Sequence, residues 1–556
     1  MTAETRRWVG SGVAPGTAVA ASWRVDRPLP AGCGSIDPDD VERAFGAVAA
    51  DLERLADRAR AQGRRAAGDI VAVGALIARD FGLVGAARQA ATHADPLRAI
   101  NDAVETYAGM IESLPDETLR ERAADVRQVG RRVLERIVRV DAGVGVNQSR
   151  RRFVLIADEI GPADLLEHLG QGLAGAVAVH GGANSHAAIV ARSVGLPLIT
   201  GIDPGVLDLP DNTALLIDAD AGVVLADPAE AEVAVAGAAS AREAARRVVL
   251  AAERELPHLT ADGQRFALLC NVASDIEVRV GRDSRAAGVG LLRTELPFLD
   301  FDRWPTEADH RRVLRPILAE AAGWPVTLRL LDFANDKIPP FLGGTSAGLS
   351  TLLDNPAALH AQLRAAVDLG RGVPLQIMVP MVTNVAEIKA VRAAVDAVVG
   401  ELGVPSVPVG AMVETMAAVE AIDELCLVAD FLSIGTNDLT AQVLHLGRLD
   451  PRARPELTAH PYVLELVAAV VAGARLADRP VSVCGDAGAH PTTLPLLLGA
   501  GVRSVSVACA RIDETRYRLR RLDTTVCEGL YADALHLPDA EDTAALVRER
   551  IGVTVP

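Results

Sequence analysis

The spacing of apolar residues divides the chain into stretches with different periodicities. A turn and a short strand between Gly10 and Trp23 come first, and such a strand must pair with strands that lie later in the chain. From Asp37 to about Arg139, apolar residues recur at three- and four-residue spacing between charged ones, which is typical of amphipathic helices. The clearest run is Leu119, Ala123, Val126, Val129, Val133 and Ile137. We therefore predict a helical subdomain, residues 33–143, inserted after the first strand.

After the helical stretch the pattern changes to short apolar runs that alternate with helices. They are Arg152–Ala157, a helix around Leu165–Leu169, Ala176–Val179, a helix after His186, Pro197–Ile199, Ala214–Ile217 and Val223–Leu225. This alternation predicts a small α/β domain made of residues 1–32 and 144–228. The Ala/Arg/Glu-rich stretch that follows, residues 229–257, predicts a semi-rigid linker helix.

Residues 258–556 repeat one unit, an apolar run followed by a helical pattern or a polar loop. The runs are Phe266–Val272, Gly288–Arg293, Val326–Asp332, Leu375–Met381, Val407–Glu414, Phe431–Asp438, Val481–Asp486 and Ser504–Ala508. Eight such units predict a (β/α)8 TIM barrel. The fold class is thus a multidomain α/β protein with an inserted helical subdomain, a linker helix and a C-terminal barrel.

Reactive side chains stand at the C-terminal ends of the predicted barrel strands, the face on which barrels build active sites. They are Asn271, Arg293, Arg329, Asp332, Glu414, Asn437, Asp438, Cys484 and Asp486. Solvent contact at strand ends explains two or three such residues, but not this whole set. Arg293 and Arg329 suit a phosphate or carboxylate group, and Glu414 and Asp438 offer the oxygen ligands that Mg²⁺ takes. The set predicts a site for a small phosphorylated acid with Mg²⁺.

A second candidate site lies in the α/β domain. A glycine turn, Gly181-Gly182, precedes Ser185 and His186, which begin a short helical pattern that Gly195 can end. Unpaired N–H groups and the helix dipole at such a position favour an anion, including a phosphoryl group on His186 itself. An ordinary capped helix with a surface histidine explains the local pattern equally well. The barrel site decides between them, because it supplies a phosphoryl source for a histidine domain that can swing on the linker.

Composition excludes several other classes of protein. The chain has 556 residues and a formal net charge of −17, so it offers no basic stripe for nucleic acid or an anionic membrane. Its six cysteines form no CxxC pair, which argues against a disulfide framework or a zinc site. No apolar run of about 18 residues and no signal-peptide pattern is present. We expect a soluble, cytoplasmic protein.

Several motifs resemble those of one known family, enzyme I of the bacterial phosphoenolpyruvate (PEP):sugar phosphotransferase system. The resemblance covers almost the whole chain in the family's order. The matching stretches are Glu121 to Arg127, Gly181-Gly182-x-x-Ser185-His186-x-x-Ile189-x-Ala191-Arg192, Gly288 to Glu295, Met412 to Thr415, and Ser433 to Thr440.

The resemblance implies a role for each matching residue. His186 is the nucleophile that becomes phosphorylated on Nε2. PEP is bound by Arg293, Arg329, Asn437, Asp438 and Arg448, the last placed by counting from Asn437. Glu414 and Asp438 hold Mg²⁺, and Cys484, which by its chemistry alone is equally a buried barrel cysteine, protonates the enolate to pyruvate. The partners implied are the histidine phosphocarrier protein HPr, docked on the helical subdomain, and a second copy of the chain, which joins the first through the barrels.

The sequence departs from the family pattern at four places. Gly161 stands before Pro162, where the family has a threonine that orients the imidazole, so we expect His186 to have lost a partner that would fix its ring. Ala334 replaces a glycine after Arg329, Asp486 replaces a glutamate after Cys484, and Pro340 to Gly348 lacks an expected arginine.

Two alternative interpretations stay open. A relative of pyruvate phosphate dikinase or PEP synthase shares the histidine domain and the barrel, but it needs a large nucleotide-binding domain for which this chain has no room. A divergent paralogue that senses PEP, or serves a different carrier, is consistent with the missing arginine.

Overall fold

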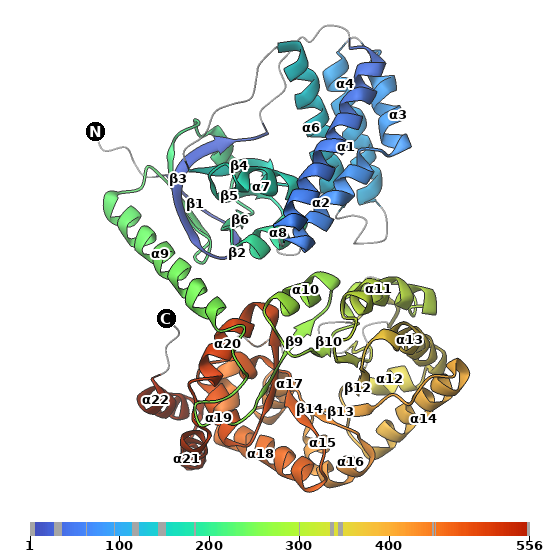
Figure 1. Cartoon of the computed structure of the whole chain (residues 1–556), viewed down its shortest axis with the longest axis vertical. Helices are drawn as coiled ribbons and strands as arrows, with labels where there is room; N and C mark the ends of the chain where they lie inside the picture. Colours follow the sequence, from blue (N-terminus) through green and yellow to red (C-terminus); the bar gives the residue numbers. More distant parts are fainter. Residues whose placement is uncertain are drawn as a thin grey trace. The chain divides into compact units, whose positions relative to one another are not determined.

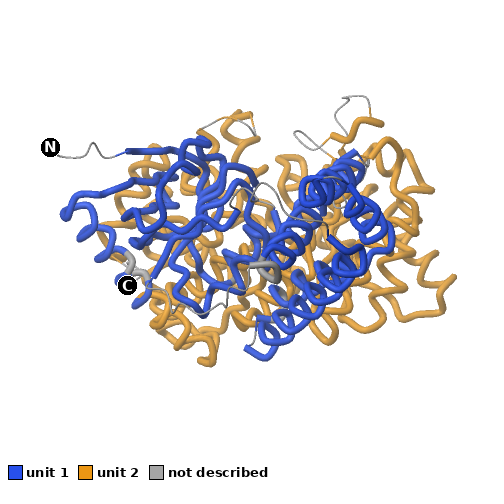
Figure 2. Tube along the Cα trace, turned by 90° about the horizontal axis from the view of Figure 1, so that it is seen from above, with its two compact units in different colours: residues 1–245 blue, residues 246–556 orange. Residues whose placement is uncertain are grey.

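A computed structural model describes residues 6–26, 36–62, 64–93, 95–113, 122–142, 152–182, 185–299, 301–333, 338–342, 348–447, 450 and 452–552. The chain forms two compact units, residues 1–245 and 246–556, which Figure 2 colours separately. Figure 1 labels their helices and strands.

The first unit is built on one mixed sheet in the order β1-β8-β7-β3-β4-β5-β6-β2. Its strands are β1 (Arg6–Val9), β2 (Ser11–Ala14), β3 (Thr17–Arg24), β4 (Phe153–Glu159), β5 (Leu173–His180), β6 (Leu198–Thr200), β7 (Ala214–Asp218) and β8 (Val223–Ala226). The centre, β3-β4-β5-β6, is parallel, and β4 and β5 are buried along almost their whole length. Helices α7 (Pro162–Leu169) and α8 (His186–Val194) follow β4 and β5. The early strand therefore does pair with later ones, as predicted.

A bundle of helices is inserted between β3 and β4 (Figure 1). Its members are α1 (Pro38–Ala61), α2 (Arg65–Ile77), α3 (Phe81–Ala90), α4 (Pro96–Glu112) and α6 (Arg122–Ala142). Asp37 and Asp80 cap the starts of α1 and α3 by accepting backbone N–H groups. On α6 the predicted apolar face from Ala123 to Ile137 is buried, which confirms the three- and four-residue pattern there. Leu119, at the start of that pattern, lies outside the described residues.

A buried carboxylate joins the helical bundle to the α/β domain. Asp164 on α7 pairs with Arg131, and its Oδ1 lies 3.1 Å from Nη2 of Arg132, both on α6. Its Oδ2 also accepts the N–H of Gly161 at 3.1 Å. Burial alone raises the pKa of Asp164, but the two guanidinium groups outweigh it and hold this pKa well below its usual range. Glu167, 2.7 Å from Arg132, balances the second arginine.

The linker is helical, as predicted. Helix α9 spans Glu230–Ala252. Just beyond its end, Nη2 of Arg254 lies 2.6 Å from Oδ2 of Asp513, and Oε1 of Glu253 lies 2.6 Å from Nη2 of Arg521. These ion pairs anchor the end of the linker to α20 (Ile512–Leu519) and the residues after it.

The second unit is a closed parallel barrel of eight strands, which confirms the predicted TIM barrel. The strands are β9 (Ala267–Val272), β10 (Val289–Leu292), β11 (Val326–Arg329), β12 (Leu375–Val379), β13 (Val409–Val413), β14 (Leu432–Ile434), β15 (Val481–Val483) and β16 (Ser504–Ala508). Alternate residues such as Ile377 and Val409 pack outward on the helices, in the main hydrophobic core. Leu291, Met378, Met412, Phe431 and Cys484 form a separate small apolar cluster. This alternation follows from the two-residue period of a strand.

Helices surround the barrel and extend it at the C-terminus. They are α10 (Asp275–Asp283), α11 (Glu307–Glu320), α12 (Leu349–Leu353), α13 (Pro356–Leu369), α14 (Val385–Leu402), α15 (Met416–Glu420), α16 (Ile422–Val428), α17 (Thr436–Val443), α18 (Pro461–Leu476), α19 (Thr493–Gly499), α20, α21 (Thr524–Ala534) and α22 (Ala540–Ile551). Short 3-10 turns occur after several strands, among them Leu296–Phe298, Pro340–Leu342, Asp486–Ala489 and Cys509–Arg511.

Among the described residues, no single helix is long and apolar enough to cross a membrane. By length and composition alone, Ala67–Ile77 and Phe81–Ala90 pass such a test as a pair, with a bend of 52° between them.

Removing the Asp164 carboxylate should destabilise the first unit. Asp164→Asn leaves two buried guanidinium groups without their shared partner, which costs about 3 kcal/mol. For a unit of this size, that corresponds to a fall in melting temperature of about 6–12 °C by calorimetry. Asp57→Asn, which removes an exposed partner of Arg60, serves as the control and should cost less than about 1 kcal/mol. Equal shifts in the two variants would contradict the importance of the buried cluster.

Candidate active site

His186 is the first residue of α8. Ser185 caps this helix, and its Oγ accepts the N–H of Ala188 at 3.2 Å. The helix ends at Gly195, whose φ of 66° lies in the left-handed region that favours glycine. The start and end predicted from the sequence are both confirmed. The imidazole therefore lies beside a helix N-terminus, where unpaired N–H groups favour negative charge.

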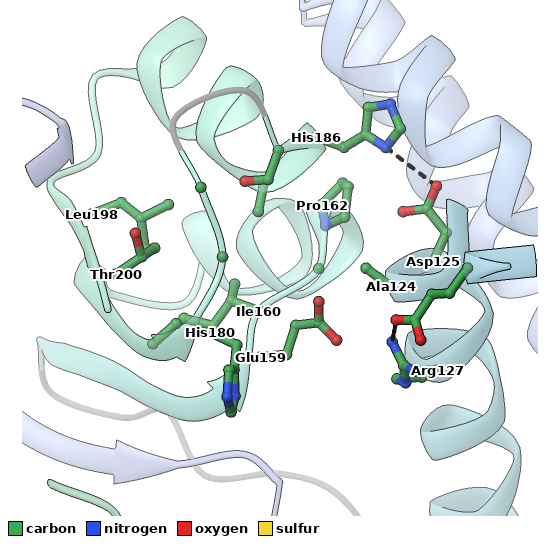
Figure 3. A pocket seen from close by; sticks show the side chains of 17 residues that line it. Ala124, Asp125, Arg127, Glu159, Ile160, Pro162, His180, His186, Leu198 and Thr200 are labelled. Carbon is green, nitrogen blue, oxygen red and sulfur yellow. Dashed lines mark hydrogen bonds and ion pairs between the residues drawn. The ribbon is translucent and has the colours of Figure 1, made fainter. Parts of the chain in front are cut away.

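The imidazole of His186 contacts a carboxylate from the helical bundle (Figure 3). Its Nδ1 lies 3.3 Å from Oδ2 of Asp125 on α6, and the two side chains are 12% and 6% exposed. The same Oδ2 lies 3.0 Å from Nη1 of Arg122. The sequence motif contains Asp125, but its spacing along the chain gave no sign that it faces His186. The loss of the threonine before Pro162 therefore does not leave the ring without a polar neighbour.

The space beside Gly161 is taken by the end of a side chain from helix α6. A Cβ atom at Gly161 would lie 2.1 Å from Cδ of Gln128, so the Gln128 side chain occupies that space. Gln128 lies on α6, one turn beyond Asp125, and is buried. Helix α6 thus supplies both the side chain that fills the space before Pro162 and the carboxylate that faces the ring.

A pocket of about 320 Å³ opens beside His186 (Figure 3). Its lining includes Glu112, Asp125, Arg127, Glu159, His180, Ser185, His186 and Thr200. Arg127 pairs with Glu105 at 2.9 Å and with Glu112 at 2.6 Å. Hydrogen bonding to Arg127 lowers the pKa of Glu112, whereas burial raises the pKa of Glu159. The pocket therefore presents both signs of charge to a group that approaches His186.

In the barrel, Arg329 is buried at the end of β11 between two carboxylates. Its Nη2 lies 2.6 Å from Oε1 of Glu295, and its Nη1 lies 2.9 Å from Oδ2 of Asp332. Burial alone lowers the pKa of Arg329, but Glu295, Asp332 and Glu414 outweigh it and raise this pKa. The guanidinium is therefore charged and held in one orientation. Sequence reasoning did not assign a role to Glu295, although it lies within a matching motif.

Glu414 is buried at the end of β13, close to two other carboxylates. Burial, then the charges of Asp332 and Asp438, raise its pKa to about 8, although Arg329 acts in the opposite direction. Its Oε1 accepts the N–H of Met381 at 2.7 Å. A Cβ at Gly435 would lie 2.6 Å from its Oε2, so only glycine allows this close approach. The sequence-predicted pair, Glu414 and Asp438, is thus brought together.

Cys484 and Asn437 lie at neighbouring strand ends. The Cys484 thiol donates to the carbonyl of Ile434, with Sγ and O 3.6 Å apart, and its burial raises its pKa to about 11. The thiol is therefore protonated at neutral pH. Asn437 donates to Oδ2 of Asp486 at 2.8 Å and accepts the N–H of Asp486 at 3.0 Å. Asp486, shorter than the family's glutamate, still reaches Asn437.

The two remaining arginines differ in what the structure describes. Arg293 is half-buried at the end of β10, and its charge acts on the pKa of Cys484, which places it in the same mouth of the barrel. Its guanidinium forms no ion pair with any described residue. Arg448 lies outside the described residues. Asn271 belongs to the barrel wall, where it donates to the carbonyl of Cys484 at 3.0 Å.

Comparison with known proteins gives the class of this chain. Models of the PEP-utilising enzymes match three parts of it in order, namely the N-terminal domain over residues 9–122, the mobile domain over 150–222 and the PEP-binding domain over 248–524. The chain thus belongs to the class of PEP-utilising enzymes.

Relatives narrow the class to one family. The chain is 32% identical to the phosphoenolpyruvate-protein phosphotransferase of Streptomyces coelicolor, over 91% of this chain and 92% of that one. It is 31% identical to that of Cupriavidus necator, over 81% of each. The chain belongs to the phosphoenolpyruvate-protein phosphotransferase family, whose chemistry is PEP-dependent phosphoryl transfer.

Other matches are longer or less alike. A multiphosphoryl transfer protein of Xanthomonas campestris is 32% identical over 98% of this chain, which spans 67% of that protein's length. The solved N-terminal domain of "Enzyme 1 - Nitrogen" is 25% identical over 44% of this chain and 99% of its own, with a TM-score of 0.30.

The raised pKa of Glu414 should make the stability of the barrel depend on pH. Without divalent cations the folded state keeps this proton up to about pH 8, whereas the unfolded chain releases it near pH 4.3. Between these values the folded state binds more protons, so the free energy of unfolding falls as pH rises, by at most about 1.4 kcal/mol per pH unit. Glu414→Gln cannot titrate and should reduce the decline seen by urea unfolding in EDTA between about pH 6 and 8.

Glu424→Gln changes an exposed carboxylate on α16 and should keep the wild-type slope. If Glu414→Gln also keeps that slope, Glu414 is ionised in the folded barrel and its assigned environment is wrong.

Proposed function

We propose that this protein transfers the phosphoryl group of PEP to Nε2 of His186 and then to a histidine of an HPr-type phosphocarrier protein, releasing pyruvate. This is the first step of sugar uptake by a phosphotransferase system. The observation that carries the proposal is the orientation of His186. Nδ1 faces the Asp125 carboxylate, which leaves Nε2 as the nitrogen available to attack phosphorus.

The barrel mouth supports the binding of PEP. Arg329 is charged and oriented by its two carboxylates, and the half-buried Arg293 is available for a phosphate or carboxylate oxygen. Asn437 supplies a polar group beside them, and Arg448 belongs to the same proposed set. When Nε2 attacks, the bridging P–O bond breaks and the enolate of pyruvate is left. The protonated thiol of Cys484 then donates its proton to the methylene carbon of the enolate.

The carboxylates at the barrel mouth fit a magnesium ion. Glu414 is buried near Asp332 and Asp438; burial, and then the charges of these two carboxylates, raise its pKa, and a divalent cation relieves the repulsion among them. Mg²⁺ takes few protein ligands and keeps water and substrate oxygens, so two carboxylates are enough for it. We assign Glu414 and Asp438 to the ion, which when bound neutralises phosphate charge. Glu414 and Asp438 supply the carboxylate oxygens that face the ion.

The helical bundle supports docking of the carrier. Helix α2 packs against α7 and α8, the helix that His186 begins. At the corner between α2 and α3, Leu76 and Phe81 are 67% and 96% exposed. Apolar side chains this exposed are typical of interaction sites. We therefore assign carrier binding to this subdomain, residues 33–143.

The remaining assignments complete the proposal. Residues 1–32 and 144–228 form the phosphohistidine domain, 229–257 the linker, and 258–556 the PEP-binding barrel that also forms the homodimer. The protein acts in the cytoplasm. During transfer the histidine domain swings to the barrel mouth on the linker helix.

Incubation with labelled PEP and Mg²⁺ tests the nucleophile. We expect acid-labile label on the wild-type protein and none on His186→Ala, because the attacking nitrogen is gone. His180→Ala changes a second histidine of the same pocket and should still be labelled. Label that survives His186→Ala would falsify the assignment, and a wild-type protein without label would favour a paralogue that only senses PEP.

Chase of the labelled protein with an HPr-type carrier tests the docking surface. Phe81→Ala should lower transfer to the carrier at sub-saturating concentration about tenfold, as expected for an interface hot spot. Self-phosphorylation by PEP should not change. Leu427→Ala, a control at an exposed apolar residue of the barrel, should leave both steps intact. Normal transfer by Phe81→Ala would move the docking site elsewhere.

A further inference from the structure

We propose that Asp125 is the positioning residue that fixes the tautomer of His186 and thereby makes Nε2 the nucleophile. This inference rests on the proposed function and names how its central residue is prepared. Three observations carry it: the 3.3 Å contact between Nδ1 of His186 and Oδ2 of Asp125, the burial of both side chains, and the origin of the carboxylate in a separate element, α6.

The contact indicates which ring nitrogen of His186 carries the hydrogen. A carboxylate oxygen is an acceptor, so we infer that Nδ1, the ring nitrogen 3.3 Å from it, carries the hydrogen. A neutral imidazole holds one ring hydrogen, and its other nitrogen, Nε2, is then left with a lone pair. Arg122, 3.0 Å from the same Oδ2, limits the freedom of the carboxylate to turn away.

The same contact also serves the transfer step. The lone pair of Nε2 forms the N–P bond while the bridging P–O bond of PEP breaks and its electrons remain on the enolate oxygen. Nδ1 keeps its hydrogen throughout, so the ring gains positive charge when the N–P bond forms. The Asp125 carboxylate stabilises that charge, and because the contact is largely buried the effect is stronger than in water.

The position of Asp125 is set by how α6 is anchored. Arg131 and Arg132, about two turns further along α6, bind the buried Asp164 of α7. Gln128, between them and Asp125, occupies the space above Gly161. The carboxylate that contacts the ring therefore comes from the helical bundle, while the ring itself comes from the α/β domain.

Imidazole ¹⁵N chemical shifts of the full-length, unphosphorylated protein test the tautomer directly. The His186 signals are assigned by difference against His186→Gln. In the wild type we expect a protonated Nδ1 and an unprotonated Nε2. Asp125→Asn, which keeps the shape but not the charge, and Asp125→Ala should both shift the ring toward the Nε2–H tautomer. Asp102→Asn, an exposed carboxylate on α4, is the matched control and should leave the ring unchanged.

Single-turnover labelling by PEP provides the second measurement. Both Asp125 variants should be labelled at least about tenfold more slowly than the wild type, the usual effect of losing a group that orients a reactive histidine. Asp102→Asn should be labelled at the wild-type rate. A role of Asp125 confined to folding would lower the melting temperature but leave the ring ¹⁵N shifts as they are.

The outcomes separate this inference from the function on which it rests. Unchanged ring ¹⁵N shifts in Asp125→Asn overturn the inference, whatever the labelling shows. Label retained by His186→Ala overturns the proposed function, while the tautomer measurement is made without PEP and is unaffected. If Asp125→Ala does not fold, the isosteric Asp125→Asn decides the question.

Discussion

The first unit depends on one buried ionic cluster. Asp164 accepts two guanidinium groups from α6 and the N–H of Gly161, and Glu167 balances the second arginine. Two carboxylates and two guanidinium groups thus close on one another, which is the condition under which buried charge is tolerated. The cluster fixes α6 against the α/β domain at the start of α7. Every residue that α6 presents to His186, including Asp125, takes its position from that attachment.

The barrel uses charge in the opposite way. At its mouth, Arg329 is neutralised by Glu295 and Asp332, but Glu414 is then left beside the charges of Asp332 and Asp438. A closed parallel barrel holds these strand ends in one small region regardless of their repulsion. Charge is balanced within the Asp164 cluster, whereas at the barrel mouth Glu414 lies close to two further carboxylates.

Most of the fold and part of the site could be predicted because they depend on local pattern. Buried strands are visible in the sequence as apolar runs, and α6 as a repeating apolar face. Because active sites of TIM barrels lie at the C-terminal ends of the strands, residues from distant strand ends could be assigned to one mouth. Strand β1 (Arg6–Val9) was missed, because a short, exposed antiparallel edge has no such pattern. The contacts of Asp125 with His186 and of Glu295 with Arg329 were missed for another reason. They join different elements, and nothing in the spacing of either residue indicates its partner.

Gly161 shows how this limit affects a functional argument. Compared with the family's sequence pattern, this chain has a glycine before Pro162 in place of a residue that orients the imidazole. In three dimensions the space belongs to Gln128, whose Cδ would lie 2.1 Å from any Cβ at that position. A larger residue there requires the amide end of the Gln128 side chain to shift, and Gln128 and Asp125 lie one turn apart on the same helix. In this chain the carboxylate of Asp125 on α6 faces the ring, so a glycine before Pro162 does not leave the imidazole without a polar neighbour.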